Sequence, residues 1–149
     1  MHSSNGFTLI ELLIVLVLAL ILSAAAYPAY TQFAVRARRT EAQAALHLLM
    51  QQQERYFSRH GSYIAFDADA TDDDARAFQW WSGVKASSSA YEVEGKACDD
   101  AAITDCVQLI ARPGTARVDG KFRDEACENL VLTSTGLRLA TGPSPNCWR

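Results

Sequence analysis

One ionisable side chain, Glu11, interrupts an apolar run that extends from Phe7 to Tyr27. As a helix this run would be about 31 Å long at 1.5 Å per residue, which matches the hydrocarbon core of a bilayer. A carboxylate near the start of a membrane helix is costly and normally has a partner, and the run contains no cation that could pair with it. Glu11 also counts against the alternative interpretation, a secretory signal peptide cut after the small residues at 23–26. The pattern therefore predicts a membrane helix that carries one carboxylate.

The four cysteines all lie in the C-terminal third of the chain, as Cys98, Cys106, Cys127 and Cys147. An even number without C-x-x-C spacing predicts two disulfides and an oxidising compartment. A zinc site would need ligands that lie closer together, and the three histidines are far from the cysteines in the sequence. The spacing alone leaves the disulfide connectivity open.

Five aspartates cluster in an irregular segment, residues 65–90. They are Asp67, Asp69, Asp72, Asp73 and Asp74. A calcium loop that began at Asp67 would need a glycine at its sixth position and a glutamate at its twelfth. Asp72 and Phe78 occupy those positions, so we expect a solvated surface loop and no metal site.

Neither an enzyme nor a cofactor is expected, because the three histidines are scattered and the sequence has no nucleophile elbow and no glycine-rich phosphate loop. The formal charge of -3 argues against a general nucleic-acid binder, whose surface is usually strongly basic. The arginines at 36, 38 and 39 are expected to be solvated or paired with neighbours. The arginines of the strand region, Arg112, Arg117, Arg123 and Arg138, are too few to predict a DNA-binding stripe, and DNA binding is kept as an alternative.

A long helix is expected to continue over residues 29–60, which are rich in helix-forming residues and contain no glycine or proline after Pro28. Polar residues recur along one stripe at helical spacing, and apolar residues fill the rest of the surface. The stripe consists of Arg36, Thr40, Gln43, His47, Gln51, Glu54 and Ser58. Leu46, Leu49 and Phe57 are expected in the core, and Gly61 is expected to end the helix.

Strand signals follow at residues 91–94, 106–112, 130–133 and 137–139, separated by turn residues. The short connections favour an antiparallel sheet over residues 90–141. Its apolar face would lie on the C-terminal half of the helix, which predicts an α+β fold shaped like a lollipop. The aromatic residues Phe78, Trp80 and Trp81 are expected to fasten the preceding segment to the helix, and an exposed adhesive patch is the alternative.

The segment Gly6-Phe7-Thr8-Leu9-Ile10-Glu11-Leu12 resembles the processing site and N-terminal helix of type IV pilins and related pseudopilins. The resemblance implies that a prepilin peptidase cuts after Gly6 and methylates the new N-terminus at Phe7. It also implies that Glu11 neutralises the Phe7 amine of a neighbouring subunit, because each charge is tolerable in an apolar filament core only as part of a pair. Pro28 matches the helix-kinking proline of the family. The leader, residues 1–6, lacks the lysine or arginine that is usual in the family, so its orientation is inferred from the resemblance.

Two further parts of the chain resemble PilE-type pilins. One is Gln52–Phe57 followed by Gly61-Ser62-Tyr63, and the other joins Cys127–Leu130 with Cys147-Trp148-Arg149. In those pilins a disulfide closes the C-terminal loop, which implies pairing of Cys127 with Cys147 and of Cys98 with Cys106.

The resemblance implies a minor or accessory pilus subunit with three parts: a leader at 1–6, a transmembrane and assembly helix at 7–28, and a periplasmic globular domain at 29–149. Such a subunit waits in the inner membrane of a Gram-negative bacterium and then joins other pilin subunits in an extracellular pilus. Its implied partners are the prepilin peptidase and the inner-membrane assembly machinery, and its implied roles are pilus biogenesis, twitching motility, adhesion or DNA uptake. The alternatives are a type II secretion pseudopilin and a DNA-binding minor pilin for competence.

Overall fold

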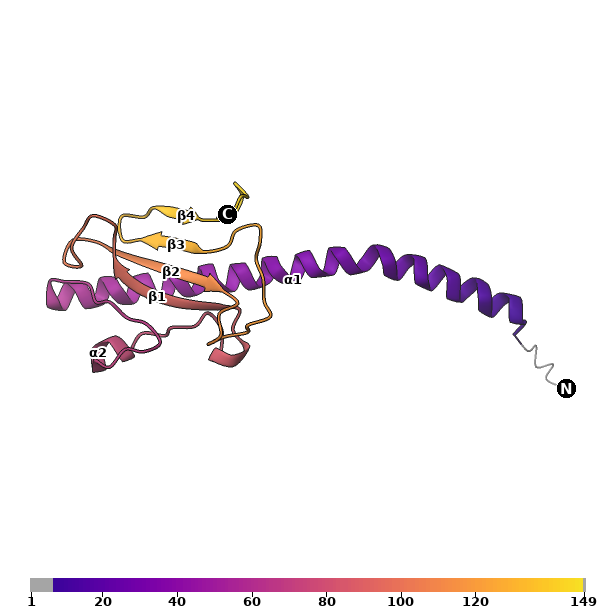
Figure 1. The fold of residues 1–149 in the computed structure, drawn as a ribbon, viewed down its shortest axis with the longest axis horizontal. Helices are drawn as coiled ribbons and strands as arrows, with labels where there is room; N and C mark the ends of the chain where they lie inside the picture. Colours follow the sequence, from indigo (N-terminus) through magenta and orange to yellow (C-terminus); the bar gives the residue numbers. More distant parts are fainter. Residues whose placement is uncertain (1–6, 149) are drawn as a thin grey trace. The chain divides into compact units, whose positions relative to one another are not determined.

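The computed structural model describes residues 7–148 of the chain, in which two compact units meet between Arg36 and Ala37. Its helices are α1 (Leu9–His60), the short α2 (Asp73–Arg76) and the 3-10 helix η1 (Ala86–Ser88), and its strands are β1 (Tyr91–Ala97), β2 (Val107–Pro113), β3 (Leu130–Thr133) and β4 (Arg138–Ala140) (Figure 1). The predicted leader at 1–6 lies outside the described residues.

The N-terminal unit contributes the first part of α1, and the helix continues through Pro28 without interruption. Its large apolar side chains are exposed to solvent in the isolated chain, from Leu9 to Leu22 and again at Tyr27, Tyr30 and Phe33. Among the residues that the structure describes, no helix combines the length and the apolar character that a membrane crossing requires. The transmembrane segment at 7–28 stays a prediction.

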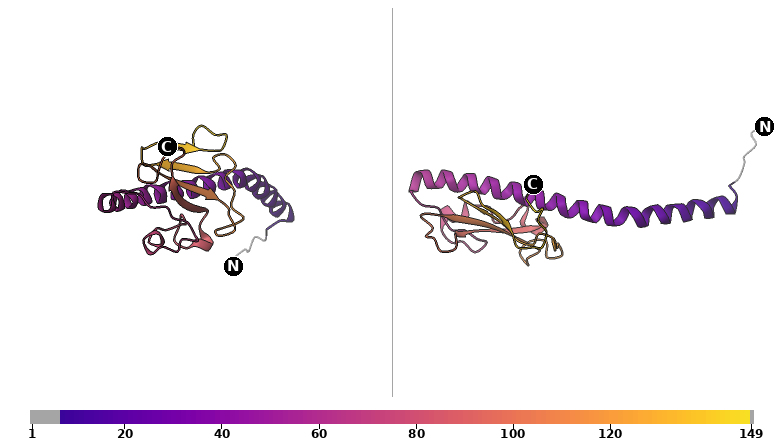
Figure 2. Two further views of the ribbon diagram at one scale, coloured as in Figure 1. Left: turned by 60° about the vertical axis from the view of Figure 1, so that its left-hand side comes forward. Right: turned by 90° about the horizontal axis from the view of Figure 1, so that it is seen from above.

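The C-terminal unit is built on an antiparallel sheet whose strands lie in the order β1-β2-β3-β4. The predicted strands are all present, and the rest of α1 packs along one face of the sheet (Figure 2). Leu46 and Leu49 of the helix are buried against Val93 and Leu109 of the first two strands, in one hydrophobic cluster. The α+β prediction is therefore confirmed. Phe57, which was also expected in the core, is only half-buried and lies outside this cluster, where its ring packs on Tyr63.

The helix ends where expected, because Gly61 follows His60 and adopts a φ of +69°, a backbone conformation that glycine reaches without strain. Gln53 then holds the returning chain: its fully buried amide donates to Ile64 O at 2.7 Å and accepts from Ile64 N at 3.1 Å.

Phe78 packs on Tyr56 of the helix as expected. Trp81 instead bridges to Glu92, so this residue fastens the segment to the edge of β1 rather than to the helix.

A buried carboxylate, Asp124, joins the helix to the loop that precedes Cys127. Arg39 donates to both of its oxygens at 2.7 Å, in a bidentate ion pair, and the Tyr91 hydroxyl donates to Oδ2. The Cys127 N–H donates to Oδ1 at 3.2 Å. Burial raises the pKa of the Asp124 carboxyl, but the hydrogen bonds from Arg39 and Tyr91 outweigh it and hold the pKa below its usual value. One carboxylate thus connects α1, β1 and the C-terminal disulfide loop.

We expect Asp124→Asn to lower the free energy of unfolding by about 3 kcal/mol at neutral pH, because the Arg39 charge would lose its ionic partner in a partly buried position. Since the folded-state pKa of Asp124 is depressed, its contribution is complete above the unfolded-state pKa of about 3.9 and is lost as the pH falls through the folded value. The difference between the two proteins should therefore shrink in acid. Urea unfolding followed by circular dichroism measures both effects.

The matched control is Asp73→Asn, which removes an exposed ion pair with Arg76 and should change stability by less than about 0.5 kcal/mol. An equal loss in the two variants, or a difference that grows below pH 4, would contradict the role assigned to Asp124.

Candidate functional site

The predicted assembly segment begins with a capping box. Thr8 donates to Glu11 Oε2 through both its backbone N–H, at 2.9 Å, and its hydroxyl, at 2.8 Å. The Glu11 N–H lies 3.4 Å from the Thr8 hydroxyl, which closes the reciprocal pattern at the first turn of α1. The sequence signal for this cap is Thr-x-x-Glu before an apolar run, which the lone carboxylate alone does not reveal.

This geometry gives Glu11 a second role beside the one inferred from the resemblance. In the isolated chain its carboxylate satisfies the first donors of the helix, so it is not without a partner. Phe7, immediately before the box, is exposed, whereas Gly6 lies outside the described residues. Cleavage after Gly6, methylation of Phe7 and assembly roles for Glu11 and Pro28 remain predictions.

Both disulfides implied by the resemblance are present. Cys127 is bonded to Cys147 and Cys98 to Cys106, with Cα atoms 5.6 Å and 5.4 Å apart. The C-terminal loop folds tightly on its own disulfide, because a Cβ added at Gly142 would lie 2.6 Å from the carbonyl carbon of Cys127. Gln43 of α1 donates to Cys147 O at 2.5 Å, so the helix holds this loop at a second point beyond Asp124.

The acidic segment has a local structural explanation. Asp67 accepts from Asp69 N at 2.8 Å, and Asp72 caps α2 by accepting from the backbone N–H groups of Asp74 and Ala75. Asp69 itself pairs with Arg117. Within residues 7–148 no group of acidic, histidine or cysteine side chains is arranged to hold a metal ion.

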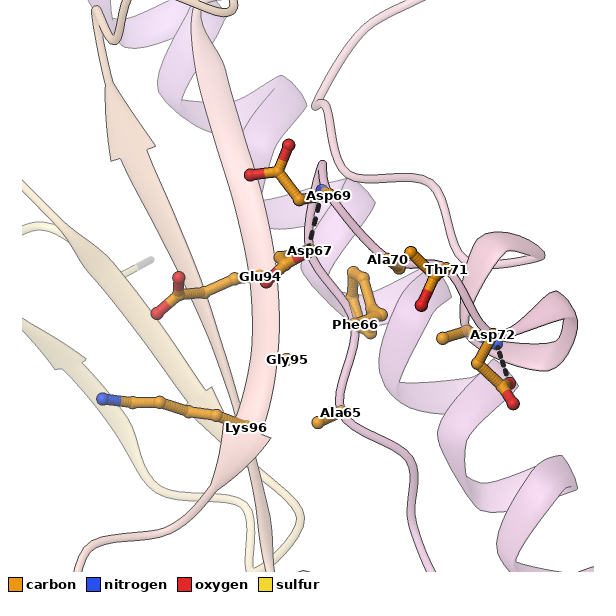
Figure 3. A pocket seen from close by; sticks show the side chains of 11 residues that line it. Ala65, Phe66, Asp67, Asp69, Ala70, Thr71, Asp72, Glu94, Gly95 and Lys96 are labelled. Carbon is orange, nitrogen blue, oxygen red and sulfur yellow. Dashed lines mark hydrogen bonds between the residues drawn. The ribbon is translucent and has the colours of Figure 1, made fainter.

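A shallow cleft of about 490 Å³ lies beside this segment, between residues 65–75 and β1. Its floor is the Phe66 ring, which packs so closely on Gly95 that an added Cβ would lie 2.5 Å from it. Figure 3 shows that Glu94 and Lys96 extend away from the segment on the other side of the strand. The acidic groups are thus split between two faces and do not converge in the cleft.

The arginines of the strand region are engaged within the chain. Arg112 forms an ion pair with Glu94, Arg117 with Asp69 and Glu92, and the Arg138 guanidinium lies 6.0 Å from the centre of the Trp148 ring. Arg123 donates to loop carbonyls. Three of these side chains therefore meet an acidic or aromatic neighbour, whereas Arg123 meets only carbonyl oxygens.

Comparison with known proteins places these features in one family. Residues 28–131 match the family described as "Type IV minor pilin ComP, DNA uptake sequence receptor", and residues 1–27 match the prokaryotic N-terminal methylation motif. A type IV pilin from Shewanella oneidensis is 24% identical, with a TM-score of 0.48, and the match covers 77% of this chain and 98% of that one.

The non-core minor pilin PilV of Neisseria meningitidis has the same fold: the match covers 77% of this chain and 94% of PilV at 19% identity, with a TM-score of 0.50. The helix-on-sheet architecture agrees with the match to PilV. Because the family match spans more than half of the sequence, the chain belongs to the type IV minor pilins of the ComP family.

Proposed function

We propose that this minor pilin is the DNA receptor of a pilus that takes up DNA. The observation that carries the proposal is the family match over residues 28–131, which includes most of the C-terminal unit. The sequence alone had placed DNA uptake among several roles of a pilus subunit and had kept DNA binding as an alternative. The family match now favours that role over twitching motility or general adhesion.

The electrostatics of the chain limit how such a receptor works. With a formal charge of -3, the protein has no overall attraction for a polyanion, so binding must come from a local group of cations. Three of the arginines in the strand region are occupied by acidic or aromatic neighbours. A small number of phosphate contacts gives modest affinity, which suits a receptor that must release DNA after uptake.

The receptor reaches the pilus through its N-terminus. In this proposal the prepilin peptidase removes residues 1–6, the subunit waits in the inner membrane on residues 7–28, and the assembly machinery inserts it among other pilin subunits. Support comes from the N-terminal methylation motif at 1–27 and from the exposed apolar surface of the first part of α1. Glu11 then exchanges its contact with Thr8 for the Phe7 amine of a neighbouring subunit.

The assembly role of Glu11 can be separated from its capping role. Glu11→Gln keeps the capping box, since glutamine serves at this position, but removes the charge. We expect normal cleavage and at least an approximately tenfold lower content in sheared pili, because the neighbouring ammonium would be left unpaired at a cost above ~1.4 kcal/mol. Mass spectrometry of the membrane and pilus fractions measures both quantities.

Thr8→Val is the matched control, because it removes the capping hydroxyl and retains the carboxylate. It should enter pili at the wild-type level. If Glu11→Gln enters equally well, or if Thr8→Val causes the larger loss, the charge has no assembly role.

The receptor function predicts loss of natural transformation in a strain that lacks this subunit, while pili still assemble because the subunit is a minor one. The purified full-length protein in detergent should bind DNA fragments of its own species more tightly than fragments of unrelated DNA of equal base composition. Competition in a gel-shift assay measures this preference. Unchanged transformation in the deletion strain, together with no shift at low salt, would reject the proposal.

A further inference from the structure

Two neighbouring loops in the C-terminal unit carry a surplus of cations, and we call residues 83–90 and 114–123 the basic loop pair. The first contains Lys85 and no acidic residue. The second contains Arg117, Lys121 and Arg123 and a single acid, Asp119. In an acidic protein such a local surplus is the kind of surface that can attract a polyanion.

Hydrogen bonds hold the two loops together at the end of the sheet where β1 begins and β2 ends. Asp119 N donates to Ser89 O at 2.9 Å, and Gly114 N donates to Ala90 O at 3.0 Å. The Ser89 hydroxyl also donates to Lys85 O at 2.8 Å, which fixes the backbone next to the Lys85 side chain. Figure 1 shows the short helix η1, in salmon, beside the orange loop that follows β2.

Arg123 is pre-positioned within this pair. Its Nη1 donates to Gly120 O and to Phe122 O, each at 2.7 Å. The turn is tight, because Gly114 adopts a φ of +62° and a Cβ there would lie 2.1 Å from Phe122 O. The Nε and Nη2 atoms make no hydrogen bond to any residue among 7–148, so one edge of an exposed guanidinium is available for a bidentate contact with a phosphate.

The neighbouring charges leave three cations available. Arg117 is occupied by Asp69 and Glu92, whereas neither Lys85 nor Lys121 forms an ion pair with a residue among 7–148. The Asp119 carboxylate accepts from Lys121 N at 3.1 Å, and the acids that follow the pair are the buried Asp124, which pairs with Arg39, and the exposed Glu125 and Glu128. The Glu41 carboxylate of α1 lies beside Gly83 of the first loop and pairs with Arg38. Acidic residues therefore lie near the basic loop pair, but within the described part of the chain none of them forms an ion pair with Lys85, Lys121 or Arg123.

The other end of the sheet has the opposite character. The loop between Cys98 and Cys106 carries Asp99, Asp100 and Asp105, all exposed, and no lysine or arginine. The acidic segment at 65–75 is not confined to this end: Phe66 pairs with Gly95 of β1, whereas Asp69 pairs with Arg117 of the basic loop pair. The three aspartates of the loop between Cys98 and Cys106 repel phosphate from this end, so the two ends of the sheet differ in their attraction for a polyanion.

We propose that the basic loop pair binds the phosphate backbone of DNA through Lys85, Lys121 and Arg123. This inference rests on the proposed receptor function, to which it adds the contact surface and its orientation. The two exposed lysines supply attraction, and the anchored guanidinium of Arg123 fixes the position of one phosphate. The acidic loop closed by Cys98 and Cys106 faces away from the bound DNA.

The test uses full-length protein in detergent and a fluorescein-labelled DNA duplex, with anisotropy measured over a salt series. Three phosphate contacts predict that log K falls against log salt with a slope of about -2.7. The double variant Lys85→Gln/Lys121→Gln should bind at least about tenfold more weakly at low salt, and its slope should be smaller in magnitude by about 1.8. Arg123→Lys retains the charge and should lower affinity severalfold with little change of slope.

The matched control is Arg55→Gln/Arg59→Gln, which removes the same charge from exposed positions near the end of α1 and should leave affinity within about twofold. Equal weakening by the two double variants would overturn the localisation while leaving the receptor function in place. Absence of DNA binding by the wild-type protein at low salt would instead reject the receptor function and the basic loop pair together. Circular dichroism of each variant distinguishes a lost contact from a lost fold.

Discussion

The bidentate ion pair between Arg39 and Asp124 is the contact on which the C-terminal part of the unit depends. A carboxylate that is almost fully buried is tolerated only when its charge and hydrogen-bonding capacity are satisfied, and here an arginine, a tyrosine hydroxyl and the Cys127 N–H satisfy it together. The ion pair fixes the position of the segment before Cys127 against the helix. The disulfide then closes this loop over 20 residues and keeps it there.

The same helix face continues this attachment with a spacing of four residues. Arg39 binds Asp124, Gln43 donates to Cys147 O, and the His47 ring meets Trp148 edge-on at 6.2 Å between centroids. Residues four apart lie above one another on a helix, so one line of polar side chains can follow the whole C-terminal segment. The apolar line beside it, which includes Leu46 and Leu49, meets the sheet. The helix thus has two adjacent faces, one that contacts the C-terminal segment and one that contacts the sheet.

How far the sequence predicts this structure depends on whether a residue acts locally or across the fold. Gly61, the strand positions and the helical stripe follow from periodicity and turn chemistry, and the structure has them. Gln43 and His47 were found on the stripe, but their partners lie about 100 residues away and leave no local signal. The buried Gln53 is a similar case, since its partner is the backbone of Ile64 rather than a recognisable side chain.

Asp67 and Asp72, by contrast, accept hydrogen bonds from backbone N–H groups two and three residues later. Such short-range contacts are predictable from the turn preferences of aspartate in the sequence.

For the candidate site, the sequence does not show which group each charged side chain contacts in the folded chain. Counting the arginines of the strand region indicated that a basic stripe was absent, but it could not separate Arg117, whose charge is neutralised by two acids, from Arg123, whose Nη1 contacts only carbonyl oxygens. Carbonyls orient a guanidinium without cancelling its charge, whereas a carboxylate does both. A protein with a net negative charge can therefore keep a directed cationic group if the anchoring ligands are neutral. The proposed assembly role of Glu11 and the proposed attraction through these loops use residues in different compact units, so each can be altered without removing the groups on which the other depends.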